Sequence, residues 1–172
     1  MARWANEAYS GRSFRYGARG LPGYALPVLY DYFVAVDDTM AALAFEDPDN
    51  ARCPGYAELA VKGADPITDL LPVETSLTRR TLAEVEADPD RGRDIALLED
   101  GEAAAVLSLA NSFRDALAAA DDGALQTAAA AFVEQNEEDA EVEDVIAFLK
   151  ELAALAAGAA AEGHRLYCTI SL

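Results

Sequence analysis

Cysteine and histidine are scarce in the sequence, and long apolar runs are missing. The two cysteines, Cys53 and Cys168, have no CxxC spacing and no clustered histidines, so we expect two reduced thiols and no zinc site. No stretch approaches the ~20 apolar residues that a membrane-spanning helix needs, and residues 1–20 lack the apolar segment of a secretory signal. These absences predict a cytoplasmic protein that does not enter a membrane.

Motifs of common catalytic sites are also missing. The sequence has no P-loop, no GxGxxG, no GxSxG and no HExxH. The single histidine, His164, lies four residues before Cys168, about 13 Å along an extended strand and too far for a catalytic pair. A histidine at a helix end also complements the helix dipole. We therefore predict no catalytic residues, no metal ligands and no cofactor.

The chain has many charged residues, and acidic residues outnumber basic ones. The 172 residues include 31 Asp or Glu against 13 Lys or Arg, for a net charge of −18. Hydrophobic residues make up 52% of the chain, enough for the core of one folded domain. An acidic body repels nucleic acid and anionic membranes and attracts basic proteins or cations. We therefore expect a partner other than nucleic acid or membrane.

The chain divides into an N-terminal arm, residues 1–24, and a single α+β domain, residues 25–172. The arm interleaves arginines with aromatic residues and is broken by glycines, which argues against a regular element. It is either a flexible arm or a segment whose aromatic rings dock on the core. Alternation of arginine and aromatic residues also suits stacking on nucleic acid, but repulsion from the acidic body argues against that function.

Two strands are expected near the ends of the domain. Residues 28–36 are rich in β-branched and aromatic side chains, and Asp37 and Asp38 are suited to cap a helix that runs to Phe45. The competing interpretation is one long helix that begins at Pro27. Residues 165–172 alternate apolar and polar, as a half-buried strand does. We expect this strand to pair with residues 28–36.

The segments between these strands are predicted to be mostly helical. The last helix is the clearest, because its apolar residues recur at helical spacing and Gly163 follows as a C-cap. The expected elements, in chain order, are a loop over 46–55, a weak strand over 56–63, a helix over 64–80 that restarts at Pro72, a short helix over 81–87, a turn over 88–93, a hairpin of 95–98 with 103–109, and helices over 111–120 (capped by Asn111 or Ser112), 121–135 and 141–162. The predicted fold is α+β, a single domain with a small sheet in which the N-terminal and C-terminal strands pair, packed against several helices.

Residues 88–99 have a partial resemblance to a calcium-binding loop. Asp88, Asp90 and Glu99 fall at positions one, three and twelve of an EF-hand. However, Arg93 stands at position six, where the turn requires glycine. We therefore expect a turn with capping aspartates rather than a calcium site.

Residues 134–144, EQNEEDAEVED, concentrate carboxylates without any Lys or Arg among them. An acidic first turn stabilises a helix N-terminus, which accounts for the last three acids but not for the first four. The segment is a solvated surface, a loose cation site, or a surface for a basic protein, since complementary fields speed encounter. The residues predicted to bind a partner are Glu134, Glu137, Glu138, Asp139, Glu141, Glu143 and Asp144.

Three functional hypotheses follow. The first is a non-catalytic, acidic protein-interaction domain with a basic protein partner, for example an immunity or inhibitor protein for a cationic toxin such as a nuclease. The second is a small-molecule-binding domain or enzyme with a cleft lined by Tyr30, Tyr32, Arg79, Arg80 and Tyr167. The third is a structural or regulatory subunit that docks through the arginine-rich arm. The sequence does not determine the oligomeric state.

Three segments carry a resemblance to a known family. VLYDYFVAVDD (28–38) opens the domain, VKGADPITDLLPVETSLTRR (61–80) lies in its middle, and FLKELAALAAGAAAEGHRLYCTISL (148–172) closes it. In this order they resemble the YfbM-like family of uncharacterised bacterial proteins. The resemblance implies a fold rather than an activity and carries over no functional residues. The N-terminal arm departs from the family's pattern.

Overall fold

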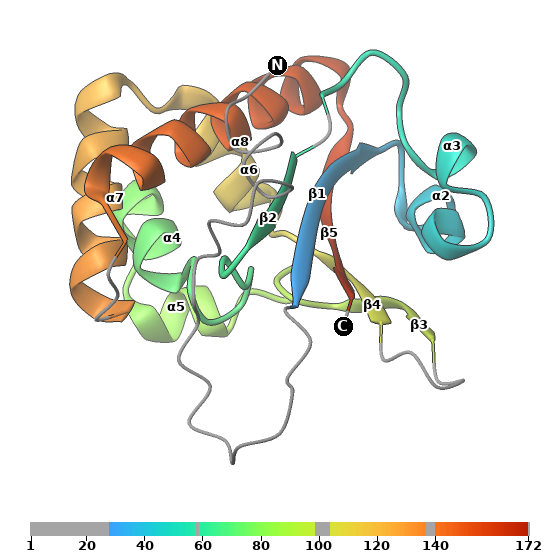
Figure 1. Cartoon of the computed structure of the whole chain (residues 1–172), viewed down its shortest axis with the longest axis horizontal. Coiled ribbons are helices and arrows are strands. Elements are labelled where there is room, and N and C mark those ends of the chain that lie inside the picture. The colour runs from blue at the N-terminus through green and yellow to red at the C-terminus, as the bar shows by residue number, and fades with distance from the viewer. Residues whose placement is uncertain (1–27, 58, 99–103, 137–139, 172) are drawn as a thin grey trace.

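A five-stranded antiparallel sheet forms the centre of the protein (Figure 1). The structure is a computed structural model, and it describes residues 28–57, 59–98, 104–136 and 140–171. The strand order is β2-β1-β5-β4-β3. The strands are β1 (Leu29–Ala35), β2 (Leu59–Lys62), β3 (Asp94–Leu98), β4 (Ala104–Ser108) and β5 (Arg165–Ser171). The predicted fold class, α+β with the N-terminal and C-terminal strands of the domain paired, is confirmed.

The pairing of β1 with β5 ties the two ends of the domain together. Tyr32 lies opposite Cys168, and Phe33 lies opposite Tyr167. Because side chains alternate between faces, each strand contributes to both sides of the sheet. All four of these side chains are buried. Because the side chains on both faces of these strands are apolar, the two strands lie inside the sheet with a core on either side.

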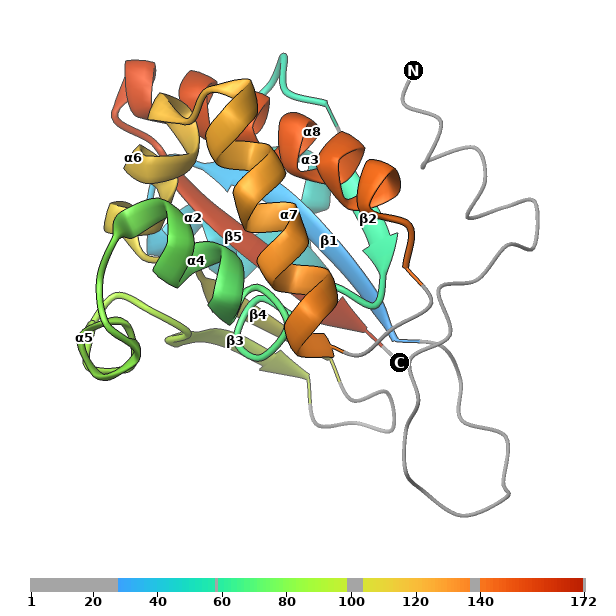
Figure 2. The same cartoon turned by 90° about the vertical axis from the view of Figure 1, so that its left-hand side faces the viewer.

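Four helices cover one face of the sheet (Figure 2). They are α4 (Leu71–Thr78), α6 (Asn111–Ala119), α7 (Asp122–Asn136) and α8 (Val142–Glu162). The apolar stripe of α8, including Leu149, Leu152 and Ala156, packs into the same core as Tyr32 and Leu166. Small residues along α8 allow this close approach. This layer contains the larger of the two cores.

The described elements cover the other face at one end, at the right in Figure 1. The covering elements are α2 (Asp38–Ala41), the 3-10 helix η1 (Ala42–Phe45) and α3 (Pro48–Ala51). Phe33, Val106 and Tyr167 of the sheet pack there against Ala41 and Ala44. The molecule therefore has a thick helical layer on one face and a small helical cap on the other.

Most local predictions are confirmed by the capping contacts. Asp37 accepts a hydrogen bond from the amide of Met40 and begins α2, and Gly163 ends α8 with φ of 71°. The helix α5 (Leu82–Glu86) opens with a capping box of Thr81 and Glu84. The hairpin of β3 with β4 also forms. The connection between these two strands, residues 99–103, and the arm, residues 1–24, lie outside the described residues.

Three local predictions are wrong. The helix expected over 64–80 begins only at Leu71, after a turn over 66–70. The segment predicted as a loop over 46–55 contains α3, a single helical turn with Pro48 at its first position. The N-cap of α6 is Ala110, not Asn111 or Ser112. Those two side chains bond instead to the carboxylates of Asp90 and Asp88, so tertiary contacts take the groups that a local cap would use. None of the described helices is long and apolar enough to cross a membrane.

Candidate functional site

The junction of α7 and α8 presents a group of exposed carboxylates. Glu134 lies in the last turn of α7, and Glu141, Glu143 and Asp144 lie at the start of α8. All four are exposed. The other three predicted partner-binding residues, 137–139, lie outside the described residues. The four described acids are therefore exposed to solvent, and they lie at one junction between two helices.

The charge of this junction is not compensated by ion pairs. Of the Arg and Lys residues in the described part of the chain, all except Lys62 and Arg79 lie within 4.0 Å of a carboxylate elsewhere. The pairs are Arg52–Asp31, Arg80–Asp88, Arg91–Glu74, Arg93–Asp38, Arg114–Asp115, Lys150–Asp122 and Arg165–Asp38. None of these pairs includes a described acid of the junction. Within the described chain, no ion pair therefore offsets the charge of these four acids.

Two of the described arginines lie far from this junction. Arg93 and Arg165 both contact Asp38 and Asp90 near the C-terminal end of α8, where β5 begins. The 21 residues of α8 separate the two ends by about 30 Å. That distance exceeds the Debye length of about 8 Å at physiological salt, so Arg93 and Arg165 do not neutralise the field at the junction.

Helix stability explains only part of the acidic junction. Glu143 and Asp144 lie in the first turn of α8, where negative charge is favourable because of the helix dipole. Glu134 lies instead at the C-terminal end of α7, and the last turn of a helix carries partial negative charge. No basic residue is present in that last turn. The position of Glu134 is therefore unfavourable for the helix and needs another explanation.

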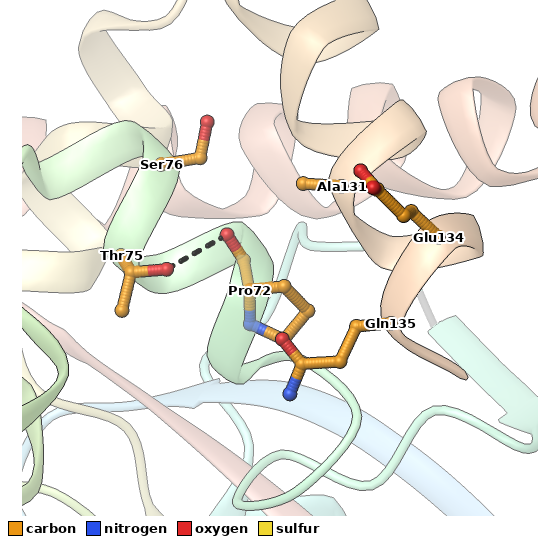
Figure 3. A pocket seen from close by; sticks show the side chains of 6 residues that line it. All are labelled: Pro72, Thr75, Ser76, Ala131, Glu134 and Gln135. Carbon is orange, nitrogen blue, oxygen red and sulfur yellow. Dashed lines mark hydrogen bonds between the residues drawn. The ribbon is translucent and has the colours of Figure 1, made fainter. Parts of the chain in front are cut away.

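A groove between α4 and α7 begins beside Glu134 (Figure 3). Its volume is about 390 Å³. It is lined by Pro72, Thr75, Ser76, Ala131, Glu134 and Gln135. The hydroxyl of Thr75 donates to the carbonyl oxygens of Leu71 and Pro72, both at 3.1 Å, so it is bonded within α4. The short side chains of Ser76 and Ala131 leave the space between the helices open.

A second hollow shares the lining residue Ser76 with this groove. Its volume is about 510 Å³, and its walls come from the end of α4, from α6 and from the start of α7. Arg79, which lines it, has a φ of 55°, the left-handed conformation that ends α4. Arg79 also lacks an ion pair among the described residues. The groove therefore has Glu134 at its edge, whereas the second hollow is lined by both Arg79 and Asp121.

The cleft expected for a small molecule does not form. Tyr32 and Tyr167 point to opposite faces of the sheet, because Tyr32 pairs with Cys168 rather than with Tyr167. Both rings are fully buried, and burial raises the pKa of both phenols. The hydroxyl of Tyr32 donates to the carbonyl oxygen of Ala64, and that of Tyr167 donates to Asp38 at 2.8 Å. Neither tyrosine therefore contributes to a shared cleft.

The turn over 88–93 is a site of ion pairs. Asp88 accepts hydrogen bonds from Arg80 at 2.7 Å and from Ser112 at 3.0 Å, and Asp90 lies 3.1 Å from Arg165. These contacts connect the turn to neighbouring elements. Within the described ranges, no group of three or more His, Cys, Asp or Glu side chains is placed to hold a metal ion.

Sequence reasoning missed the contact of His164 with Cys53. The imidazole Nδ1 lies 3.5 Å from the Cys53 Sγ, although 111 positions separate the residues. Cys168, the cysteine nearest to His164 in the sequence, is instead fully buried on the face of the sheet that the helices cover. No spacing in the sequence predicts a contact between loops so far apart.

Comparisons with models of protein families, with curated proteins and with solved structures found no match.

Proposed function

We propose that this protein is a non-catalytic, acidic interaction domain that binds a basic protein. The binding surface is the junction of α7 and α8. It consists of Glu134, Glu137, Glu138, Asp139, Glu141, Glu143 and Asp144. The observation that carries the proposal is that its described carboxylates are exposed and share no ion pair with the cations of the described chain.

The arrangement favours a macromolecular partner over a small cation. The described acids lie on two helices and present no cluster with the geometry of a metal site. A basic protein surface needs no such fixed geometry, since attraction between opposite fields acts over several ångströms. Binding such a partner also relieves the mutual repulsion of the carboxylates.

The groove beside Glu134 supplies contact area next to the charge. Charged rims mainly raise association rates, whereas buried side chains in pockets set the lifetime of a complex. The groove between α4 and α7 has room for a side chain of the partner, with the Glu134 carboxylate at its edge. A partner residue with an apolar stem and a positive head, Arg or Lys, matches both properties.

One concrete form of this function is an immunity or inhibitor protein in the cytoplasm. A cationic toxin such as a nuclease binds phosphates through arginines and lysines. A rigid surface of carboxylates occupies those same side chains and thereby excludes the substrate. The kinship with the YfbM-like family remains a prediction, and it adds a fold to this proposal but no activity.

The test compares two charge-reversed variants of equal net charge. In the first, Glu137, Glu138 and Asp139 are replaced by Lys. In the second, the matched control, Glu46, Asp49 and Glu162 are replaced by Lys; these are exposed acids near α3 and at the far end of α8. Proteins that co-purify from the native host at low salt are identified, and the basic candidate is prepared in pure form.

The association rate of the purified pair is the deciding measurement. We expect the junction variant to associate about 10- to 100-fold more slowly than the wild type, and the control variant to change far less. The difference between the variants should shrink as salt is raised, because screening weakens both fields. Equal effects of the two variants would show that only total charge matters and would refute the assignment of the surface.

A further inference from the structure

Two side chains with metal-binding chemistry meet on the far side of the protein from the acidic junction. Cys53 follows α3, and His164 follows the C-cap of α8. The Cys53 Sγ lies 3.5 Å from the His164 Nδ1. Both side chains are partly exposed, so solutes can reach them. The contact therefore brings a thiol and an imidazole together at an accessible position.

Backbone contacts hold both residues in place. The amide of Cys53 donates to the carbonyl oxygen of Val34 at 2.8 Å, which attaches its loop to the end of β1. The amide of His164 donates to the carbonyl oxygen of Ala159 at 2.8 Å, and its own carbonyl oxygen accepts from Arg114 at 2.5 Å. The pair is therefore fixed by the fold before any ligand arrives.

Tyr56 forms a wall beside the pair. Its ring meets the imidazole of His164 edge-on, with centroids 6.4 Å apart. The ring lies against α8 at Gly158, where an added Cβ would be 2.7 Å from the Tyr56 Cε1. Only glycine leaves room for the ring in this position, so the sequence of α8 allows Tyr56 to pack beside His164.

We propose that Cys53 and His164 bind a thiophilic metal ion of the zinc class. A Zn–S bond of about 2.3 Å and a Zn–N bond of about 2.0–2.1 Å, opened at a tetrahedral angle, place sulfur and nitrogen about 3.5 Å apart. The observed separation is 3.5 Å. The distance between the two donors therefore equals that between two ligands of one tetrahedral ion.

The donor types agree with such an ion. Thiolate and imidazole together select zinc and related ions rather than magnesium or calcium, which prefer oxygen. The site offers two protein ligands within the described chain, which leaves two coordination positions for water or for a ligand from another molecule.

The alternative is a simple hydrogen bond between the thiol and the imidazole. Burial raises the pKa of the Cys53 thiol, so an ion must displace its proton in order to bind. Binding of the metal ion therefore releases this proton to solvent. A simple hydrogen bond leaves the proton on the pair. This inference does not rest on the proposed interaction with a basic protein, because it concerns other residues and another ligand.

The experiment titrates the purified full chain with Zn²⁺ in competition with a chromophoric chelator, and with Co²⁺ as a spectroscopic substitute. We expect one equivalent of ion to bind, with a thiolate-to-cobalt charge-transfer band. Cys53→Ser and His164→Gln should each weaken binding by at least about tenfold, since even the partners that orient a ligand are worth about 10- to 100-fold. Circular dichroism confirms that each variant is folded.

The matched control is the double variant Glu143→Gln with Asp144→Asn, which removes acids of the junction. This control should bind Zn²⁺ as the wild type does. The proposal would be overturned if the wild type does not bind Zn²⁺ at micromolar concentration, or if the wild type and both site variants bind it equally. A loss of binding in Cys53→Ser alone would also overturn it, because the thiol would then bind the ion without the imidazole. A loss in the junction control would assign the ion to the carboxylates and overturn it as well.

Discussion

Arg91 and Glu74 form an ion pair in the interior, with the Arg91 Nε 2.8 Å from the Glu74 Oε2. The side chains are 9% and 1% exposed. The Nη2 of Arg91 also donates to the carbonyl oxygen of Ile67 at 2.6 Å, so one guanidinium joins α4, the turn before it and the turn before β3. The Glu74 Oε1 is buried and has no hydrogen-bond partner. The carboxylate therefore depends on Arg91.

Replacing Arg91 should strongly destabilise the fold. Arg91→Met leaves the Glu74 carboxylate buried without its counter-ion, and breaking a buried pair in this way typically costs about 3–5 kcal/mol. The control is Lys150→Met, which breaks the exposed Lys150–Asp122 pair and should cost about 1 kcal/mol or less. Urea unfolding at pH 7 measures both free energies. Equal losses would mean that Arg91 contributes no more than a surface cation.

The pH dependence of the Arg91→Met loss tests its cause. Burial raises the pKa of Glu74 above its ordinary value, while the hydrogen bond and charge of Arg91 act against this rise. A carboxyl group with a raised folded-state pKa destabilises the protein above that pKa, and the penalty disappears as the pH falls through it. Without Arg91 the pKa of Glu74 rises further. The loss should therefore be smaller at pH 5 than at pH 7, and a constant loss would argue against an uncompensated carboxylate.

Tyr167 and Asp38 give a prediction of the opposite sign with pH. Burial acts to raise the pKa of Asp38, but the hydrogen bond from Tyr167 and the charges of Arg93 and Arg165 outweigh it and hold the pKa below its ordinary value. Stability from such a group is present above its unfolded pKa and is lost as the pH falls through the folded pKa. The contribution should therefore fade below about pH 4.

Tyr167→Phe removes only the hydroxyl that bonds to Asp38. Because Asp38 is partly exposed, we expect a loss of about 1 kcal/mol at pH 7, shrinking toward pH 3. Tyr32→Phe is the matched control, since its hydroxyl bonds to the uncharged carbonyl group of Ala64 and its loss should not follow the titration of a carboxylate. Unfolding curves over this pH range separate the two variants, and parallel curves would contradict the role of Asp38.

The packing of Tyr56 on Gly158 predicts a coupling between two substitutions. Alanine inside a helix is normally more stable than glycine by about 1 kcal/mol. Here the new Cβ of Gly158→Ala would meet the Tyr56 ring at 2.7 Å, so the ring must move away from His164. In a Tyr56→Ala background the same substitution is free of this contact and should stabilise. A double-mutant cycle of unfolding free energies measures the difference, and additive effects would contradict the packing.

The sequence predicts elements well where local chemistry determines them. Asp37 and Gly163 mark the start of α2 and the end of α8, β-branched and aromatic residues identify β1, and alternation identifies β5. It does not predict which residues of two paired strands share a face, because a shift of one residue in register reverses the face. The expected cleft failed for this reason, since Tyr32 pairs with Cys168 and not with Tyr167.

Contacts between distant loops are equally hidden in the sequence. The proximity of Cys53 and His164 depends on where α3 and α8 end in space, which no local pattern encodes. The acidic junction was identified because clustered charge is visible in the sequence itself. The absence of compensating ion pairs, however, became evident only when the positions of the arginines were known.

Glu134 and Glu143 offer a direct test of whether the acidic junction serves stability or binding. Glu134→Gln should stabilise the protein by about 0.3–1 kcal/mol, because it removes a negative charge from the C-terminal turn of α7. Glu143→Gln should destabilise it by a similar amount, because the acid favours the N-terminal turn of α8. Both effects should diminish at high salt in urea unfolding. Binding of the basic partner should weaken in both variants, since both remove charge from the same surface. If Glu134→Gln stabilises the fold but weakens the complex, Glu134 serves binding rather than stability. If Glu134→Gln stabilises the fold without any loss of binding, Glu134 is an ordinary solvated side chain.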